Sequence, residues 1–463
     1  MLIKNAELEG RRPIDLRCQS GVICEMGDTI KPLPGETVIN AGGGALLPGL
    51  HDHHIHLHAF AASHSSVVCG PPRVANLKQL AEVLSDVGGS GWIRGIAYHG
   101  SVAGDIDRWQ LDDLVSDRPL RIQHRSGKLW IVNTAAADIL ELEKHRELEG
   151  VECDDSGRPN GRLFRLDEWL RKHIGSPGPP DVERVSKQLA SYGVTGITDA
   201  TPGNSGEELA IFKTAIEGNR LLQRVLLMGD MDLPLASHSL IERGAYKVLL
   251  DEHKLPRVEQ LTQQITQAHQ QQRPIAIHCV TRTELVFALS TLLEAGHYPG
   301  DRIEHASVTP DEVLPLLREA RVAVVTQHGF IAERGDQYLR EVEPQYQEVL
   351  YRGRAFVEAG VPLAGSSDAP YGSADPWFAM RVAVNRKSGS GDYLGRGESL
   401  TPEQALALYT SPAGSPGAPA RTIEIGQTAD LCLLDRSWRE ARSRLVHRDV
   451  LATVKHGEPI YQR

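Results

Sequence analysis

Residues 44–60 read GALLPGLHDHHIHLHAF and form the most informative stretch of the sequence. An apolar run typical of a buried strand ends in a Pro-Gly pair, and five histidines and an aspartate then occupy eight positions. Side chains alternate between the two faces of a strand, so His54 and His56 are expected to share one face, with Asp52 one step deeper. The stretch therefore predicts a chelating histidine pair at the end of a buried strand.

The composition is that of a soluble globular protein. The chain has 463 residues, of which 41% are hydrophobic and 24% are charged, with a net charge of −10 and a pI near 6.0. An acidic chain has no general attraction for nucleic acid or anionic membranes, and both classes of partner are excluded. No signal-peptide pattern opens the sequence and no apolar run approaches the roughly 18 residues that span a bilayer. Six scattered cysteines without a CxxC pair favour free thiols in the cytoplasm.

Apolar segments in the middle of the sequence alternate with helical patterns, as in parallel α/β folds. Eight strands are predicted at 45–56, 194–200, 223–229, 244–250, 274–279, 301–306, 321–327 and 361–368. From the second strand onward their spacing suits strand–helix units. The sequence therefore predicts a (β/α)8 TIM barrel.

Both ends of the chain contain short strand patterns separated by glycine and proline. We expect residues 1–46 and 411–463 to form one composite β-sandwich. The barrel then occupies residues 47–410. The long interval 57–193 after the first barrel strand is interpreted as an inserted subdomain.

Function in a TIM barrel is located at the carboxyl ends of the strands. The metal-ligating residue types found there, in chain order, are His54, His56, Lys247, His278, His305 and Asp368. Neutral imidazole and carboxylate are good zinc ligands, and a bound zinc makes hydroxide available near neutral pH. The remaining histidines of the first strand region, His51, His53 and His58, are expected to pack or to support the ligands.

These residues give the chain a resemblance to a known family. PGLHDHHIHL resembles the Pro-Gly-x-x-Asp-x-His-x-His signature of the amidohydrolase superfamily. The resemblance extends over nearly the whole chain. More narrowly, the sequence is similar to the amidohydrolase-3 branch, which includes enzymes of the N-substituted formamide deformylase type. The branch's further elements correspond to GWIRG at 91–95, SG at 126–127 with VN at 132–133, Lys247 with Asp251, RIEH at 302–305, and the segment 426–435.

Two departures from the family pattern bear on the substrate rather than on the metal. Lys128 stands where the family has the histidine of its SGH element, and residues 251–256 read DEHKLP where DGSLGS is expected. Six further residues are predicted to line the substrate pocket: Trp92, Arg125, Lys128, Trp130, His328 and Tyr371.

The resemblance implies a cofactor of two Zn²⁺ ions per chain. The six strand-end residues would be the ligands, with Lys247 carboxylated by carbon dioxide so that its carbamate bridges the two ions. Asp368 would also act as general base and acid. The resemblance further implies a small-molecule substrate and a homodimer.

Each residue also has a plainer interpretation. Two histidines can simply end a polar strand, and a single histidine in a strand is more often a packed residue than a ligand. Lys247 could pair with an acid, because an unpaired ammonium is costly in a buried strand. Asp368, in SDAP, could cap a helix.

The sequence favours hydrolysis of a non-peptide C–N bond in a linear amide or N-acyl compound, by metal-activated hydroxide. The alternatives are hydrolysis of a cyclic amide or an ester, deamination, and a non-catalytic scaffold. Deaminases of the superfamily carry a glutamate three residues after the fifth-strand histidine, where this chain has Thr281; its first acid there is Glu284. Scaffolds of this fold have lost their histidines, whereas this chain keeps them.

Overall fold

The computed structural model describes residues 1–8, 10, 13–175 and 178–463. The chain forms two compact units. The first contains Met1–Leu57 and Val182–Arg463, and the second contains His58–Asp181.

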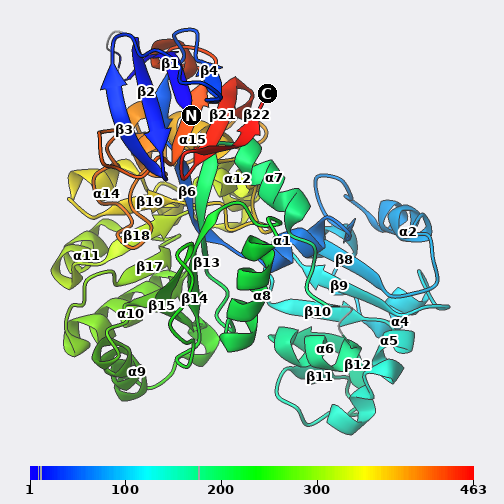
Figure 1. The fold of residues 1–463 in the computed structure, drawn as a ribbon. Helices are drawn as coiled ribbons and strands as arrows, with labels where there is room; N and C mark the ends of the chain where they lie inside the picture. The colour runs from blue at the N-terminus through cyan, green and yellow to red at the C-terminus, as the bar shows by residue number, and fades with distance from the viewer. Residues whose placement is uncertain (9, 11–12, 176–177) are drawn as a thin grey trace. The chain divides into compact units, whose positions relative to one another are not determined.

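A sheet of eight parallel strands forms the centre of the first unit (Figure 1). In spatial order the strands are β6 (Leu50–Ile55), β13 (Val194–Asp199), β14 (Arg224–Gly229), β15 (Ile241–Leu249), β16 (Ile275–Cys279), β17 (Arg302–His305), β18 (Ala323–Thr326) and β19 (Leu363–Gly365). Each overlaps one of the eight predicted segments. The first and last strands, β6 and β19, also lie against each other, so the sheet curls into a nearly closed barrel. The predicted TIM barrel is confirmed.

Helices follow the barrel strands and cover the outside of the sheet (Figure 1). The principal ones are α7 (Glu183–Ser191), α8 (Gly206–Glu217), α9 (Val258–Gln270), α10 (Arg282–Ala295), α11 (Leu314–Ala320), α12 (Gly329–Glu341), α14 (Arg354–Glu358), α15 (Pro376–Asn385) and α16 (Pro402–Ala407). Helix α10 begins with a capping box in which Thr281 and Glu284 satisfy each other's backbone N–H groups, and Ser205 and Glu208 do the same at α8.

The prediction of one strand over 45–56 is wrong, because the segment divides between two sheets. β5 (Leu46–Pro48) pairs with β20 (Leu431–Leu434), and β6 then enters the barrel. The chain passes from one sheet to the other at Gly49. A Cβ atom at this position would lie only 2.4 Å from the side chain of Thr195. Only glycine fits this close approach between backbone and neighbouring strand.

Two four-stranded sheets are built from the terminal parts of the chain, the first from N-terminal residues alone and the second from β5 with C-terminal strands. One contains β3 (Val22–Gly27), β2 (Ile14–Gln19), β1 (Leu2–Ala6) and β4 (Val38–Asn40) in that order, and the other contains β22 (Glu458–Gln462), β21 (Val450–Lys455), β20 and β5. Ile3 and Leu16 from the first sheet share one buried cluster with Leu431 and Val454 from the second. The division into a 1–46 plus 411–463 sandwich and a 47–410 barrel stays a prediction.

The second unit is built on a six-stranded sheet. Its order is β11 (Val151–Cys153), β12 (Pro159–Phe164), β10 (Leu129–Val132), β9 (Leu120–His124), β8 (Ile93–Tyr98) and β7 (Val67–Val68). Strands β7, β8 and β9 run parallel, whereas the pairs from β9 to β11 are antiparallel. The accompanying helices include α2 (Leu77–Ser85), α3 (Gly100–Ala103), α4 (Arg108–Asp112), α5 (Thr134–Ile139) and α6 (Asp167–Ile174). Across the described residues of both units, no helix combines the length and the apolar character that crossing a membrane requires.

Candidate metal centre

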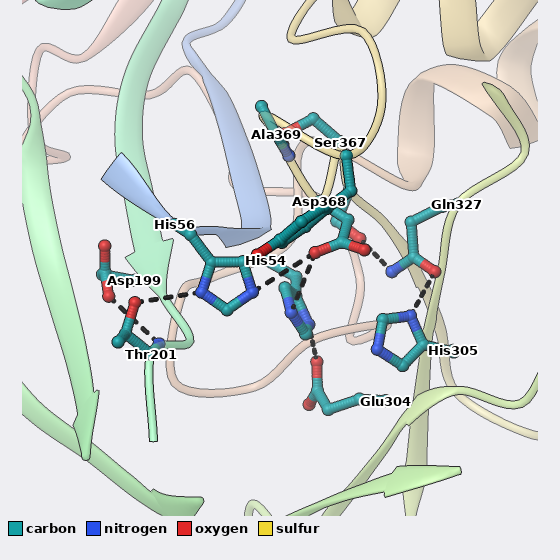
Figure 2. A network of polar contacts seen from close by, with 12 residues as sticks. His54, His56, Asp199, Thr201, Glu304, His305, Gln327, Ser367, Asp368 and Ala369 are labelled. Atoms are coloured by element: carbon teal, nitrogen blue, oxygen red, sulfur yellow. Dashed lines mark hydrogen bonds and ion pairs between the residues drawn. The ribbon is translucent and has the colours of Figure 1, made fainter. Parts of the chain in front are cut away.

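Three predicted ligands meet at the carboxyl end of the barrel. The Nε2 atoms of His54 and His56 lie 3.5 and 3.3 Å from one carboxylate oxygen of Asp368. One nitrogen or oxygen atom from each of the three side chains lies within 4.8 Å of the others. Figure 2 shows both imidazoles turned towards this carboxylate. Two imidazoles and a carboxylate at this spacing are a donor set suited to a divalent cation.

The backbone places Asp368 directly against the histidine strand. Its N–H donates to the carbonyl of His54 at 2.8 Å, and the N–H of His56 donates to the carbonyl of Ala369 at 2.9 Å. The φ of Asp368 is +52°, in the left-handed region that costs a non-glycine residue about 1 kcal/mol or more. Burial raises the pKa of Asp368, but a hydrogen bond from His56 acts in the opposite direction, and the pKa lies below its usual value. Asp368 is therefore held as a carboxylate.

The other ring nitrogens of the histidines also have partners (Figure 2). His54 Nδ1 contacts a carboxylate oxygen of Glu304, and His56 Nδ1 lies 2.9 Å from the hydroxyl of Thr201. A carboxylate only accepts, so Nδ1 of His54 carries the proton and its Nε2 lone pair is available towards Asp368. Such support of the second nitrogen orients metal-ligating histidines. The arrangement therefore fits a metal site.

His305 and His278 form a second group beside the first. The ring centroid of His305 lies 5.0 Å from that of His54 and 4.4 Å from that of His278. Nδ1 of His305 lies 2.7 Å from the amide oxygen of Gln327, which again leaves Nε2 for a ligand. Burial lowers the pKa of His54 to about 3 and also lowers that of His305. Both rings are neutral at pH 7, as ligation requires.

Lys247 is enclosed in the same region. Its side chain is 1% exposed, and Nζ has no hydrogen-bond partner within the described ranges. Among the residues that the structure describes, its ion-pair partner is an oxygen of Glu304 at 3.9 Å. Burial lowers the pKa of Lys247 to about 8. A buried ammonium without hydrogen bonds is costly, so this position has a chemical reason to be modified or to bind a partner.

Glu304 is the functional residue that sequence reasoning missed. It lies in the RIEH motif at 302–305, and its buried carboxylate contacts His54 and accepts hydrogen bonds from Arg302. Arg302 also donates to the carbonyl of His53 at 2.7 Å. The i, i+2 spacing of Arg302 and Glu304 on one strand was the available signal, since such residues share a face.

Residues 37–461 match the model of the Amidohydrolase family. The chain belongs to the amidohydrolase family. It is therefore a metal-dependent hydrolase acting on carbon–nitrogen bonds, and the scaffold alternative is wrong.

Relatives of this amidohydrolase are similar along nearly their whole length. An N-substituted formamide deformylase from Arthrobacter pascens is 25% identical, over 93% of this chain and 91% of that protein. Among solved structures, an uncharacterized metal-dependent hydrolase from Pyrococcus horikoshii superposes with a TM-score of 0.74 at 19% identity, covering 94% of this chain and 97% of that one. N-isopropylammelide isopropylaminohydrolase from Burkholderia multivorans gives a TM-score of 0.55 at 17% identity, with coverage of 100% and 98%. Both solved structures therefore share the fold of this chain.

Three other polar residues of the first strand region have partners of their own in this amidohydrolase. His51 Nε2 lies 2.8 Å from the hydroxyl of Thr198, and His53 Nε2 lies 3.1 Å from that of Ser411. The carboxylate of Asp52 accepts the N–H of His54 at 3.2 Å and that of Ser367 at 3.0 Å. These contacts join the histidine strand to its surroundings.

The predicted pocket residues of the amidohydrolase have varied environments. The ring centroid of Tyr371 lies 5.7 Å from that of His56, next to the candidate centre. His328 is 1% exposed, and within the described part of the chain neither ring nitrogen has a hydrogen-bond partner. The other four belong to the second unit: Trp92, Arg125, Lys128 and Trp130. Trp130 is buried there and donates to Asp167 at 2.7 Å, which is typical of a core residue.

Proposed function

We propose that this amidohydrolase cleaves the C–N bond of a linear amide or N-acyl compound, using two zinc ions. The observation that carries the proposal is the convergence of His54, His56 and Asp368, with the Nε2 atoms of both histidines directed at one carboxylate. The relative from Arthrobacter pascens, which covers nearly the whole chain, is an N-substituted formamide deformylase, and this supports a simple acyl group on nitrogen.

The residues divide into two sets of ligands in this proposal. One ion would be held by His54 and His56, the other by His278 and His305, and Asp368 would complete the first site. A carboxylated Lys247 would bridge the two ions, which removes the buried positive charge. Bound divalent ions lower the pKa of a water molecule and polarise a carbonyl oxygen.

Asp368 has the central role among the protein groups. Its carboxylate accepts a proton from the attacking water and returns it to the leaving nitrogen. The lowered pKa keeps it ionised at neutral pH, and its hydrogen-bonded backbone fixes its direction. Glu304 and Gln327 hold Nδ1 of His54 and His305, so that each Nε2 is left for a metal ion.

The structure favours amide hydrolysis over deamination. Thr281 occupies the position where deaminases carry a proton-shuttling glutamate, and its hydroxyl caps α10. The nearest acid in sequence, Glu284, accepts the N–H groups of Val280 at 2.7 Å and Thr281 at 3.0 Å. Glu284 is thus committed to a helix cap. Cyclic amides and esters stay open as substrates, and a cytoplasmic location and a homodimer stay predictions from the sequence.

A metal and activity measurement tests the proposal. The chain would be prepared with zinc and bicarbonate, and its metal content measured by elemental analysis alongside a screen of N-formyl and N-acetyl amines. Asp368→Asn is expected to lower kcat by about 10²–10⁴-fold, the usual contribution of general acid–base catalysis. Asp375→Asn is the matched control, because Asp375 caps α15 and contacts His447. A chain without bound metal, or an Asp368→Asn variant within tenfold of wild type, would contradict the proposal.

A further inference from the structure

A cavity of about 280 Å³ lies at the amino end of the barrel, away from the candidate metal centre. Its lining includes residues from the beginnings of four barrel strands: His51 of β6, Thr195 of β13, Arg224 of β14 and Glu242 of β15. Arg421, from the segment between α16 and β20, completes the group, and all of these residues belong to the first unit. The metal ligands stand at the carboxyl ends of the strands, so the proposed hydrolysis does not use this cavity.

Arg421 keeps part of its hydrogen-bonding capacity for this cavity. Its Nε donates to the carbonyl of Thr410 at 3.4 Å, and its Nη2 donates to the carbonyl of Gly49. Among the described residues Nη1 has no hydrogen-bond partner and Arg421 has no ion-pair partner, since the carboxylate of Asp430 pairs with Arg224 at 2.8 Å. Burial lowers the pKa of Arg421, although the charge of Asp430 acts in the opposite direction. An enclosed cation without a partner is costly, which makes Arg421 a candidate for binding an anion.

Positive charge exceeds negative charge beside the cavity. Lys455 of β21 is 8% exposed, and burial, followed by the charge of Arg224, lowers its pKa to about 8. Asp430 is the carboxylate that acts on both Lys455 and Arg421, so one anion faces three cations at neutral pH. His51 adds no charge, because burial, followed by the charge of Arg421, lowers the pKa of its ring. An anionic ligand would therefore improve the local balance of charge.

Hydroxyl groups supply further donors at the open side of the cavity. Ser239 and Thr428 line it, are exposed, and make no side-chain hydrogen bond to the residues that the structure describes. Glu242 is exposed as well, so solvent screens its negative charge. A guanidinium binds phosphate and carboxylate groups through parallel hydrogen bonds. A phosphate-like group offers more oxygen acceptors than a carboxylate, so it suits this set of several donors.

We propose that this cavity binds a small phosphate-like oxyanion, held by Arg421 and by the hydroxyls of Ser239 and Thr428. Nη1 of Arg421 would donate to the oxyanion, while Nη2 keeps its bond to the carbonyl of Gly49. Because the chain passes from one sheet to the other at Gly49, the bound anion would stabilise that junction. The site is separate from the metal centre, and it holds or fails independently of the proposed hydrolysis.

Isothermal titration calorimetry of the full chain with inorganic phosphate, at constant ionic strength, tests the site. Ser239→Glu places a carboxylate at the open side of the cavity, and Ser239→Gln is its matched neutral control. We expect Ser239→Glu to raise the Kd for phosphate about tenfold and Ser239→Gln to leave it within about twofold of wild type. Both changes are at an exposed position, so the fold should tolerate them. Equal Kd values for the two variants, or no saturable binding of phosphate, would overturn the proposal.

Arg421→Met tests the principal cation and should raise the Kd for phosphate by about tenfold or more, as loss of a hydrogen bond to a charged group predicts. Arg354→Met removes the same charge from an exposed ion pair with Glu358 and should leave the Kd unchanged. If Arg421→Met does not fold, the Ser239 variants still decide the proposal. A Kd that both arginine variants change equally, or sodium acetate that binds as tightly as phosphate, would contradict a phosphate-like site.

Discussion

Lys247 and Glu304 form a buried pair, so the proposed carboxylation of Lys247 can be tested by measuring protein stability alone. Nζ and the carboxylate oxygen are 3.9 Å apart, and the side chains are 1% and 0% exposed. At an effective dielectric constant of about 20, Coulomb's law gives an attraction of about 4 kcal/mol. We therefore expect a double-mutant cycle of Lys247→Met and Glu304→Gln to give an attractive coupling of about 2–4 kcal/mol in chelator-treated, bicarbonate-free buffer.

Zinc and bicarbonate should change this coupling. A carbamate replaces the ammonium by an anion, so the attraction to Glu304 is lost and the coupling should fall to about zero or become repulsive. The assay is urea unfolding of the wild type, both single variants and the double variant under the two conditions. Arg352 and Glu398, another buried pair with a 2.8 Å contact, provide a control cycle that should respond to neither addition.

Two outcomes would refute this reasoning. A coupling below about 0.5 kcal/mol in the metal-free chain, which is the usual error of additivity, would mean that no ion pair forms there. An attractive coupling that persists unchanged with zinc and bicarbonate would mean that Lys247 stays an ammonium. In that case the bridging role of Lys247 would have to be abandoned.

Three further predictions concern neighbouring residues. Burial lowers the pKa of His328 to about 3, so below pH 6.5 the unfolded chain binds a proton that the folded chain does not. The free energy of unfolding therefore decreases as the pH is lowered. Between pH 6 and pH 4 this decrease should be about 2.5 kcal/mol smaller for His328→Leu than for the wild type, measured by urea unfolding. Thr201→Val removes the contact to His56 and should weaken zinc binding about 10–100-fold in competition with a chelator; an unchanged affinity would remove Thr201 from the support of the site. Gln327→Leu should have the same effect through His305, and loss of stability without loss of zinc would show a packing role instead.

The barrel was predictable because its strands are continuous apolar segments at regular intervals. Five of the eight carry a candidate ligand at or near the carboxyl end, so order along the chain was enough to predict that His54 and Asp368 lie together. The break at Gly49 was not predictable, because it depends on the side chain of Thr195 from another strand. Nothing in the sequence distinguishes a strand that continues from one that changes sheets across a Pro-Gly pair.

The residues that support the ligands were also beyond sequence reasoning. Glu304 and His54 are 250 positions apart, and their contact exists only because β17 and β6 face the same barrel interior. Gln327 and Thr201 are common polar residues after a strand, and many such residues only end a strand. The type of a ligand residue is restricted by metal chemistry, whereas a hydrogen-bond partner can be almost any polar group.

The pairing of β5 with β20 has a consequence for how the chain matures. β5 stands just before the strand that carries His54 and His56, but its partner lies at 431–434. At about 5–20 residues per second, the ribosome takes roughly 20–80 s to make the intervening chain. During most of that time β5 has no partner strand, and Asp368 is made only in the last part of it. The candidate ligand group of His54, His56 and Asp368 is therefore complete only after most of the chain has been synthesised.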